Sequence, residues 1–502
     1  MSDVVVYAAT SAGVCAAVAA AEAGARVTLL EPGRHVGGMT SGGLGYTDVG
    51  DVRVLGGMAA RFRQDVADHY GVPLGHYAGP EPHVAEEILR RWLDHPRIDV
   101  VFEAPLNTAE LSNGRISRIT AGARTYDGGI FVDASYEGDL LAGAGVRYAV
   151  GREARALHGE RWAGRQDLRP GRHAMPACVS PFAADPSGEH EGPLLPQIRD
   201  VPLVATGEGD GGVMAYGYRV CLTTAADRIP FERRDGYDEA HWELGRRLCR
   251  GGYAAEAGAL LGLEPNLPNG KCDGNSLGPF SLNVLDGSAW AYPDADGPTR
   301  DEIRRHHEHH TRDFLYFLAH DEAVPRSVRD EMRRWGWPAD EFADTGHLPH
   351  QLYVREARRL VGEYVLTEHD LVAARPQHDV VAMGSYHLDV REVQRAWQWV
   401  PEHPRPIGMV VNEGYLSVPV PPYPVPYRAI VPRYADCANL LVPVCVSASH
   451  VAFSSIRMEP QYQMLGHAAG LAAVLAGDRP VQSVDVAELQ QRLRDAGQVL
   501  SV

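Results

Sequence analysis

Residues 4–43 read VVVYAATSAGVCAAVAAAEAGARVTLLEPGRHVGGMTSGG, and this stretch decides the fold class. A short apolar run is followed by a turn of small residues, an alanine-rich run that ends near Gly24, and a second apolar run closed by Glu31. A strand, a helix and a second strand in this order are typical of a βαβ unit that binds a dinucleotide. We therefore predict an α/β protein that begins with a Rossmann-like unit.

The turn before the helix matches the Gly-x-Gly-x-x-Gly fingerprint only at its third glycine, Gly13, because Ala8 and Thr10 stand at the first two positions. Small side chains are needed there, since backbone N–H groups and the helix dipole hold a pyrophosphate. We expect Ala8 to fill the turn at an ordinary φ, and the Thr10 hydroxyl to cap the helix or donate to the phosphate. Glu31 has the spacing of an acid that binds a ribose. The alternative is a βαβ unit without a nucleotide.

The composition is that of a globular protein of two or three domains, with 502 residues, 45% hydrophobic and 23% charged. A net charge of −17 and the lack of a basic run argue against a nucleic-acid or anionic-membrane partner. No apolar run reaches membrane-spanning length, and the N-terminus lacks the basic start of a signal peptide. The seven cysteines include no C-x-x-C pair, so we expect reduced thiols, no structural zinc and a cytoplasmic location.

The rest of the chain continues the pattern of a nucleotide-binding domain and then returns to it near the C-terminus. Expected helices are 56–70, 86–95, 239–251, 300–318, 326–335 and 460–476, and expected strands are 100–102, 106–111, 116–121, 124–126, 130–135, 213–223 and 439–444. Residues 351–361 favour a strand or a helix, and residues 445–455 a polar loop. We predict a nucleotide-binding domain built from residues 1–150 and 426–502, with a substrate domain and crossover segments in residues 151–425.

Four segments carry a resemblance to a known family: GGMTSGGLGYTD (37–48), VDASYEGDL (132–140), QLYVREARR (351–359) and LVPVCVSASH (441–450), the last followed by SIRMEP (455–460). In this order they resemble the FAD-dependent oxidoreductase family, some of whose members are mislabelled as xanthan lyases. The resemblance implies FAD as cofactor. It also implies a glutathione-reductase-type fold in which a discontinuous Rossmann-like FAD domain carries an inserted α+β substrate domain.

The resemblance also implies positions for the cofactor. Ser11, Ala12 and Gly13 would meet the pyrophosphate, and Glu31 the adenosine ribose. The run Gly37, Gly38, Met39, Thr40, Ser41, Gly42 and Gly43 would pass along the pyrophosphate, the ribityl chain and the flavin ring, where glycines permit close approach. Ala134 and Ser135 would lie under the adenosine side, and Ser449, Ile456, Arg457, Met458 and Glu459 beside the ribityl chain and the pyrimidine. A flexible surface loop is the alternative for residues 37–43.

Flavin oxidation of an alcohol needs a base for the hydroxyl proton. His387 follows Tyr386 and precedes Asp389, so a Tyr/His pair could supply acid and base. The alternative for His387 is a hydrogen-bonded structural histidine. His450 lies in the flavin-proximal loop if the resemblance holds, and is a second candidate.

Arg355, Glu356 and Arg358 form a dense charge set that is costly to bury unless it is paired. Arg355 is therefore a candidate for binding an acidic or hydroxylated substrate. A structural ion-pair network is the alternative.

Two further patterns are assigned no chemistry. The run 306–310, HHEHH, places His306 and His310 on one side of a helix, but no third ligand is evident. We therefore predict a solvated helix face and no metal site. Cys437 and Cys445 are expected to be buried thiols rather than a redox disulfide.

The leading functional hypothesis is an FAD enzyme that takes a hydride from an alcohol or amine carbon of a polar small molecule, such as a sugar or glycoside. Electrons would pass to O2 or another acceptor. A second hypothesis is an NAD(P)H-dependent flavin monooxygenase. A third, motivated by Ala8 and Thr10, is a flavin-free binding or lyase protein on the same fold.

Overall fold

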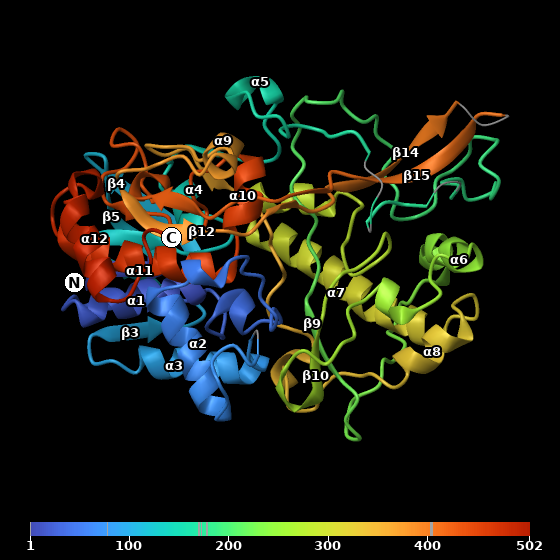
Figure 1. Ribbon diagram of the computed structural model, residues 1–502, viewed down its shortest axis with the longest axis horizontal. Coiled ribbons are helices and arrows are strands. Elements are labelled where there is room, and N and C mark those ends of the chain that lie inside the picture. The colour runs from blue at the N-terminus through green and yellow to red at the C-terminus, as the bar shows by residue number, and fades with distance from the viewer. Residues whose placement is uncertain (1, 78, 169–170, 172, 177–178, 402–404) are drawn as a thin grey trace.

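A five-stranded parallel sheet organises the molecule in a computed structural model, which describes residues 2–77, 79–168, 171, 173–176, 179–401 and 405–502. The strand order is β18-β7-β1-β2-β3. The bounds are β1 (Ser2–Tyr7), β2 (Val27–Leu30), β3 (Ile98–Val101), β7 (Gly128–Asp133) and β18 (Leu440–Leu441). One edge of the sheet therefore comes from the C-terminal part of the chain. Figure 1 shows the blue N-terminal and red C-terminal segments together on one side of the molecule.

Two buried helices cross beside this sheet. α1 (Ser11–Glu22) connects β1 to β2, and α11 (Glu459–Ala476) lies against it. A Cβ added at Gly466 would lie 2.2 Å from the Ala12 carbonyl oxygen, and one added at Gly470 would lie 2.3 Å from the Ala16 carbonyl oxygen. The two glycines therefore bring the helices to backbone contact.

Further helices and a meander surround the sheet. They are α2 (Gly57–Tyr70), α3 (Pro82–Leu93), α4 (Asp139–Gly143), α12 (Val486–Asp495), β4 (Leu106–Ser112), β5 (Arg115–Ala121) and β6 (Arg124–Tyr126). β4, β5 and β6 pair antiparallel in that order. The expected meander and the helix expected over 56–70 are confirmed, whereas α3 begins at Pro82 rather than at residue 86.

The other side of the molecule is a mixture of helices and small antiparallel sheets (Figure 1). Its elements include β9 (Val220–Thr223), α6 (Glu243–Arg250), β10 (Lys271–Gly274), α7 (Gly297–His320), α8 (Arg326–Met332), β14 (Gln394–Val400) and β15 (Ile407–Glu413). β9 pairs with β10 and β14 with β15. This is the inserted α+β part of the fold.

The long helix α7 corrects one sequence prediction. His307 and His310 are buried, so the expectation of a solvated face over residues 306–310 is wrong for these two side chains. The cause is tertiary: His310 lies against Trp242 and Phe314, in an aromatic cluster that packs along α7.

Shorter elements join the two sides. They are β8 (Tyr148–Ala149), α5 (Arg155–His158), β11 (Arg359–Leu360), α9 (Glu368–Val372), β12 (Val380–Gly384), β13 (Leu388–Val390), β16 (Leu416–Val418), β17 (Tyr423–Pro426) and α10 (His450–Ile456). β12 packs against α11, so part of residues 151–425 lies on the sheet side. The boundaries after residues 150 and 425 stay predictions.

Three local expectations differ from the structure. Only β9 is a strand within 213–223, because Ala215, Tyr216 and Gly217 hydrogen bond to three different segments. Only β11 is regular within 351–361. The polar loop expected over 445–455 contains α10, which is capped by the Ser449 side chain.

Six cysteines are described, and all six are buried free thiols. The prediction of buried thiols at Cys437 and Cys445 is confirmed, and Cys178 lies outside the described residues. Within the described part of the chain, none of the helices has the length and apolar character needed to cross a membrane.

Candidate active site

The turn between β1 and α1 keeps the shape of a glycine fingerprint without its first two glycines. Ala8 has a φ of 71°, so the expectation of an ordinary φ is wrong. A Cβ at Gly13 would lie 1.9 Å from the Ala8 carbonyl oxygen, and this packing of α1 on the turn fixes the left-handed backbone at Ala8. The expected cap is confirmed, because Thr10 Oγ1 accepts from the Gly13 N–H at 3.2 Å.

Glu31 closes the same turn from the end of β2. Its Oε2 accepts from the Ala9 N–H at 2.8 Å, and its Oε1 accepts from the Gly33 N–H at 2.6 Å. Burial raises the pKa of Glu31 to about 7, although both backbone donors oppose the shift. Each carboxylate oxygen has a second lone pair, so the predicted bond to a ribose is compatible with these contacts.

The buried carboxylate of Glu459 joins the two ends of the chain. The Ser11 and Thr40 hydroxyls donate to its Oε2 at 2.6 and 2.8 Å, and the Tyr136 hydroxyl donates to its Oε1 at 2.7 Å. Burial raises the pKa of Glu459, and the three hydroxyl donors counteract this effect. Ser11 is the first residue of α1, so this donor set lies at the positive end of a helix.

This donor set tests whether the residues present fit the pyrophosphate of a dinucleotide. The N-terminal end of α1, with the small residues Ser11, Ala12 and Gly13, is the chemistry that binds a phosphate, whereas the Ser11 and Thr40 hydroxyls already donate to the Glu459 carboxylate. The residues therefore fit the group. The phosphate and the carboxylate would compete for the same hydroxyls.

The glycine run is buried rather than a surface loop. Gly38 and Gly43 have positive φ values of 56° and 115°. A Cβ at Gly38 would lie 2.5 Å from the Tyr136 hydroxyl, and one at Gly43 would lie 2.2 Å from the Arg219 carbonyl oxygen. Ser41 donates to the Val36 carbonyl within the run. The run is therefore fixed in place at the edge of the sheet.

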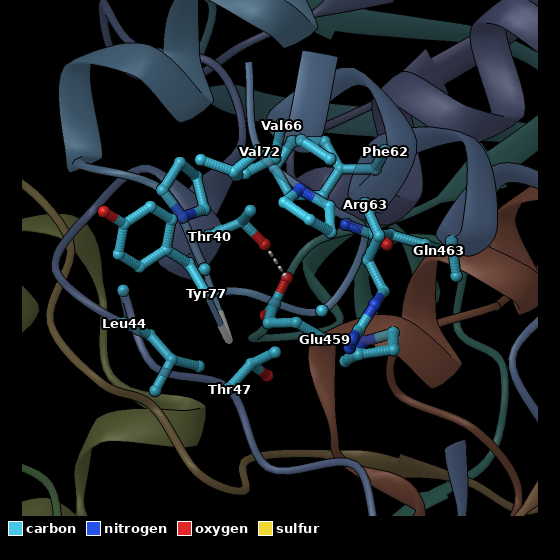
Figure 2. A pocket seen from close by; sticks show the side chains of 18 residues that line it. Thr40, Leu44, Thr47, Phe62, Arg63, Val66, Val72, Tyr77, Glu459 and Gln463 are labelled. Carbon is cyan, nitrogen blue, oxygen red and sulfur yellow. Dashed lines mark hydrogen bonds between the residues drawn. The ribbon is translucent and has the colours of Figure 1, made fainter. Parts of the chain in front are cut away.

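A narrow, mostly apolar cavity of about 40 Å³ begins at Glu459. Figure 2 shows Phe62 and Val66 on one side of it, with Thr40 and Glu459 joined by their hydrogen bond. A small gap of about 10 Å³, which also includes Glu459, continues to Arg457 and Tyr353.

Arg457 and Tyr353 also line a larger chamber of about 240 Å³. We call it the polar chamber. Its further lining includes Arg219, Arg355, Tyr386, His387, Asp389 and Arg391. The polar chamber therefore meets the N-terminal end of α11.

Three of the four predicted catalytic residues line the polar chamber, namely Arg355, Tyr386 and His387. His387 Nε2 lies 3.8 Å from Asp389 Oδ1, and its ring contacts that of Tyr386 with centroids 4.1 Å apart. Burial would raise the pKa of Asp389, but His387, Arg391 and the neighbouring Arg457 hold it well below its usual range. Asp389 therefore remains a carboxylate beside His387.

His450, the fourth, lies outside the lining of the polar chamber. It is buried, and its Nδ1 contacts Glu356 Oε2 at 2.8 Å. Glu356 also pairs with Arg359. Ser449 caps α10 and donates to Glu160 at 2.5 Å. Both residues therefore anchor α10 within a polar network.

Two of the remaining predicted cofactor residues, Ala134 and Ser135, directly follow β7. Ala134 accepts a hydrogen bond from Thr10 through its carbonyl oxygen, and Ser135 donates to Asp133 at 2.7 Å. The other members are buried, namely Ala12, Gly37, Met39, Gly42, Ile456 and Met458. Their contact with the cofactor stays a prediction.

Sequence reasoning missed several residues of the site. Tyr136 was part of a quoted motif, yet nothing in its spacing indicated that it would reach Glu459. Tyr353 also lay in a quoted motif without being singled out, and Arg391 carried no signal, because β12, β13, β16 and β17 were not expected. Only the fold brings these side chains to α11.

Two groups of metal-ligating residues also went unnoticed, and neither is arranged as an open ion site. In the first, the rings of His35 and His350 stack 4.1 Å apart and nearly parallel, so their nitrogen lone pairs do not converge on one point. The second group surrounds the Lys271 ammonium, which pairs with Glu81, Asp340 and Glu341. The absence of a metal site stays a prediction.

The parallel sheet and the turn before α1 are those of a Rossmann-like, dinucleotide-binding fold. The chain belongs to the FAD dependent oxidoreductase family, whose model matches residues 3–493. The family is one of oxidoreductases, and FAD is its cofactor. No curated protein matches the sequence.

Solved structures show partial likeness. Thioredoxin reductase of T. acidophilum is 19% identical over 26% of this chain and 34% of that chain, with a TM-score of 0.18. The 3-ketosteroid-delta4-(5alpha)-dehydrogenase from Rhodococcus jostii RHA1 is 17% identical over 27% of this chain and 46% of that chain, with a TM-score of 0.20. The p-nitrophenol 4-monooxygenase from Pseudomonas putida is 12% identical over 32% of this chain and 49% of that chain, with a TM-score of 0.21. The chain thus spans less than half the length of each of these three.

Proposed function

We propose that the protein is an FAD-dependent oxidase or dehydrogenase that takes a hydride from an alcohol or amine carbon of a polar small molecule. The observation that supports this most is the polar chamber, which places His387, Asp389 and Tyr386 together beside the N-terminal end of α11. Its walls are rich in charged and hydroxyl groups, as a polar substrate requires. The inserted α+β part would serve as the substrate domain.

Bound FAD supplies the hydride acceptor. The Ser11 and Thr40 hydroxyls and the start of α1 would hold its pyrophosphate, and Glu31 its ribose. His387 would accept the hydroxyl proton of an alcohol, and Asp389 would stabilise the resulting imidazolium. The alcohol loses a hydride and a proton and leaves as a carbonyl compound. O2 or another acceptor then takes the two electrons.

Anaerobic titration of the yellow protein tests this proposal. We expect one of a panel of polar alcohols, sugars, glycosides and amines to bleach the flavin absorbance without any nicotinamide. Bleaching by NADPH alone, followed by NADPH-dependent oxygen uptake, would instead indicate the monooxygenase. We expect the enzyme to act in the cytoplasm, in keeping with its buried free thiols.

A further inference from the structure

The polar chamber contains one arginine whose charge is not balanced. Arg355 is buried, and among the ion pairs of the described residues none includes it. Its Nη1 donates to the Ala215 carbonyl oxygen, and its guanidinium lies over the Tyr353 ring, 4.3 Å from the centroid. A carbonyl and a ring face are weak partners for a buried full charge.

Neighbouring cations already have carboxylate partners. Arg391 pairs with Glu392 at 3.3 Å, Arg457 with Asp389 at 3.1 Å, and Arg219 with Asp273 at 2.5 Å. These three pairs consume three carboxylates and leave Arg355 unmatched. Asp48 also lines the chamber, but no ion pair of the described residues joins it to Arg355.

The environment of Arg355 is therefore electrostatically unfavourable in the ligand-free protein. Burial, followed by the nearby charges of Arg391 and Arg457, lowers the pKa of Arg355 to about 9, although Tyr353 and Glu392 act in the opposite direction. The other two members of the charged set differ, because Glu356 pairs with Arg359, and Arg358 pairs with Asp139 and Asp294. The ion-pair network considered from the sequence thus includes Glu356 and Arg358 but leaves out Arg355.

We infer that Arg355 is the receptor for a carboxylate group of the substrate, so that the enzyme acts on a hydroxy or amino acid rather than on a neutral alcohol or sugar. The identification of the chamber as the substrate site rests on the proposed function. A carboxylate is the group that an arginine binds with two parallel hydrogen bonds. It would supply the carboxylate partner that Arg355 lacks and would orient the neighbouring carbon toward His387.

The first experiment measures binding without turnover. Benzoate and its neutral isostere benzamide are titrated into the FAD-loaded protein, and the change in the visible flavin spectrum is followed. We expect benzoate to bind at least tenfold more tightly than benzamide. We expect Arg355→Gln to remove that preference and Arg355→Lys to retain part of it.

A matched control distinguishes a lost receptor from general damage. Arg358→Gln removes a buried arginine on the same segment, yet Asp139 keeps its bond to Arg300. We expect benzoate binding to be unchanged in this variant. Because Arg355 has no carboxylate partner to leave behind, Arg355→Gln should retain its flavin and melt no lower than the parent.

The second experiment separates the inference from the proposed function. Lactate and 1,2-propanediol, and glucuronate and glucose, are compared as reductants of the flavin under anaerobic conditions. Equal reduction by the acids and the neutral compounds, or equal benzoate binding by Arg355→Gln, would overturn the inference while the proposed function stands. Arg355-dependent benzoate binding with reduction by NADPH alone would support the anion site and reject the proposed function.

Discussion

The Ser11 hydroxyl donates to Glu459 Oε2 at 2.6 Å, across 448 residues of sequence. These are the first residues of α1 and α11, so the two strand-to-helix junctions at opposite ends of the chain meet at one carboxylate. Thr40 and Tyr136 complete the contact. The small gap beside Glu459 leads to Arg457 and Tyr353, which also line the polar chamber.

Removing the Glu459 carboxylate should leave its three hydroxyl donors without a hydrogen-bond acceptor. Glu459→Leu leaves three buried hydroxyls without an acceptor, and we expect the free energy of unfolding to fall by about 3 kcal/mol. Glu459→Gln retains one acceptor oxygen, so its loss should stay near 1 kcal/mol. Urea unfolding of the apoprotein measures both. Equal losses in the two variants would contradict the acceptor role.

The pKa of Glu31 predicts a pH dependence. The folded pKa of about 7 exceeds the reference value of 4.5, so the folded state binds more protons between these pH values. The carboxylate therefore destabilises the apoprotein increasingly as pH rises from 4.5 through 7, by up to about 3 kcal/mol. The comparison is between the parent and Glu31→Gln over pH 4.5 to 8. The difference in unfolding free energy between the two proteins should change by about 3 kcal/mol over this pH range. Parallel curves of unfolding free energy against pH would show that the pKa of Glu31 is not raised.

Ala8 has a left-handed backbone that glycine adopts without strain. We expect Ala8→Gly to raise the free energy of unfolding by about 1 kcal/mol. Ala9→Gly is the matched control, because Ala9 has no positive φ and should lose about 1 kcal/mol in chain entropy. The urea midpoints of the two variants should shift in opposite directions. A shift of both in the same direction would show that Ala8 is not strained.

The crossing of α1 and α11 leaves no room for a side chain at Gly466. Gly466→Ala should lower the free energy of unfolding by about 3 kcal/mol and weaken flavin retention, because the helices must separate. Gly258→Ala is the control, since an added Cβ there has no heavy atom within 4 Å. Thermal melting measures the stability of the two variants, and the flavin-to-protein absorbance ratio measures their flavin retention. Retained flavin and stability in Gly466→Ala would mean that the helices lie farther apart.

We expect substitutions of His387 and of His450 to affect the rate of flavin reduction differently. His387→Gln should slow reduction by the substrate about 100-fold, because the base is lost, without lowering the flavin content. His190→Gln is the control, since His190 is exposed and contacts only Asp185 among the described ion pairs. Stopped-flow reduction measures the rate constants. A larger loss in His450→Gln than in His387→Gln would move the base to α10.

The sequence alone determined the fold class, and its resemblance to a family indicated the cofactor. The apolar runs and small residues of 4–43 specify a βαβ unit because strand and helix periodicities are local, and the return near residues 439–476 is equally local. The same local patterns gave the meander and α7. They failed over 351–361 and 445–455, where charged side chains make contacts that no periodicity encodes.

Tertiary structure decided which charges are matched. Arg355, Glu356 and Arg358 look alike in sequence, yet two of them find carboxylate or arginine partners and Arg355 faces the polar chamber without one. Tyr136 reaches Glu459, and His387 lies beside Asp389 in that chamber, only because separate segments fold together. Electrostatic balance depends on distances between residues far apart in the chain, and those distances exist only once the sheet and the crossed helices have formed.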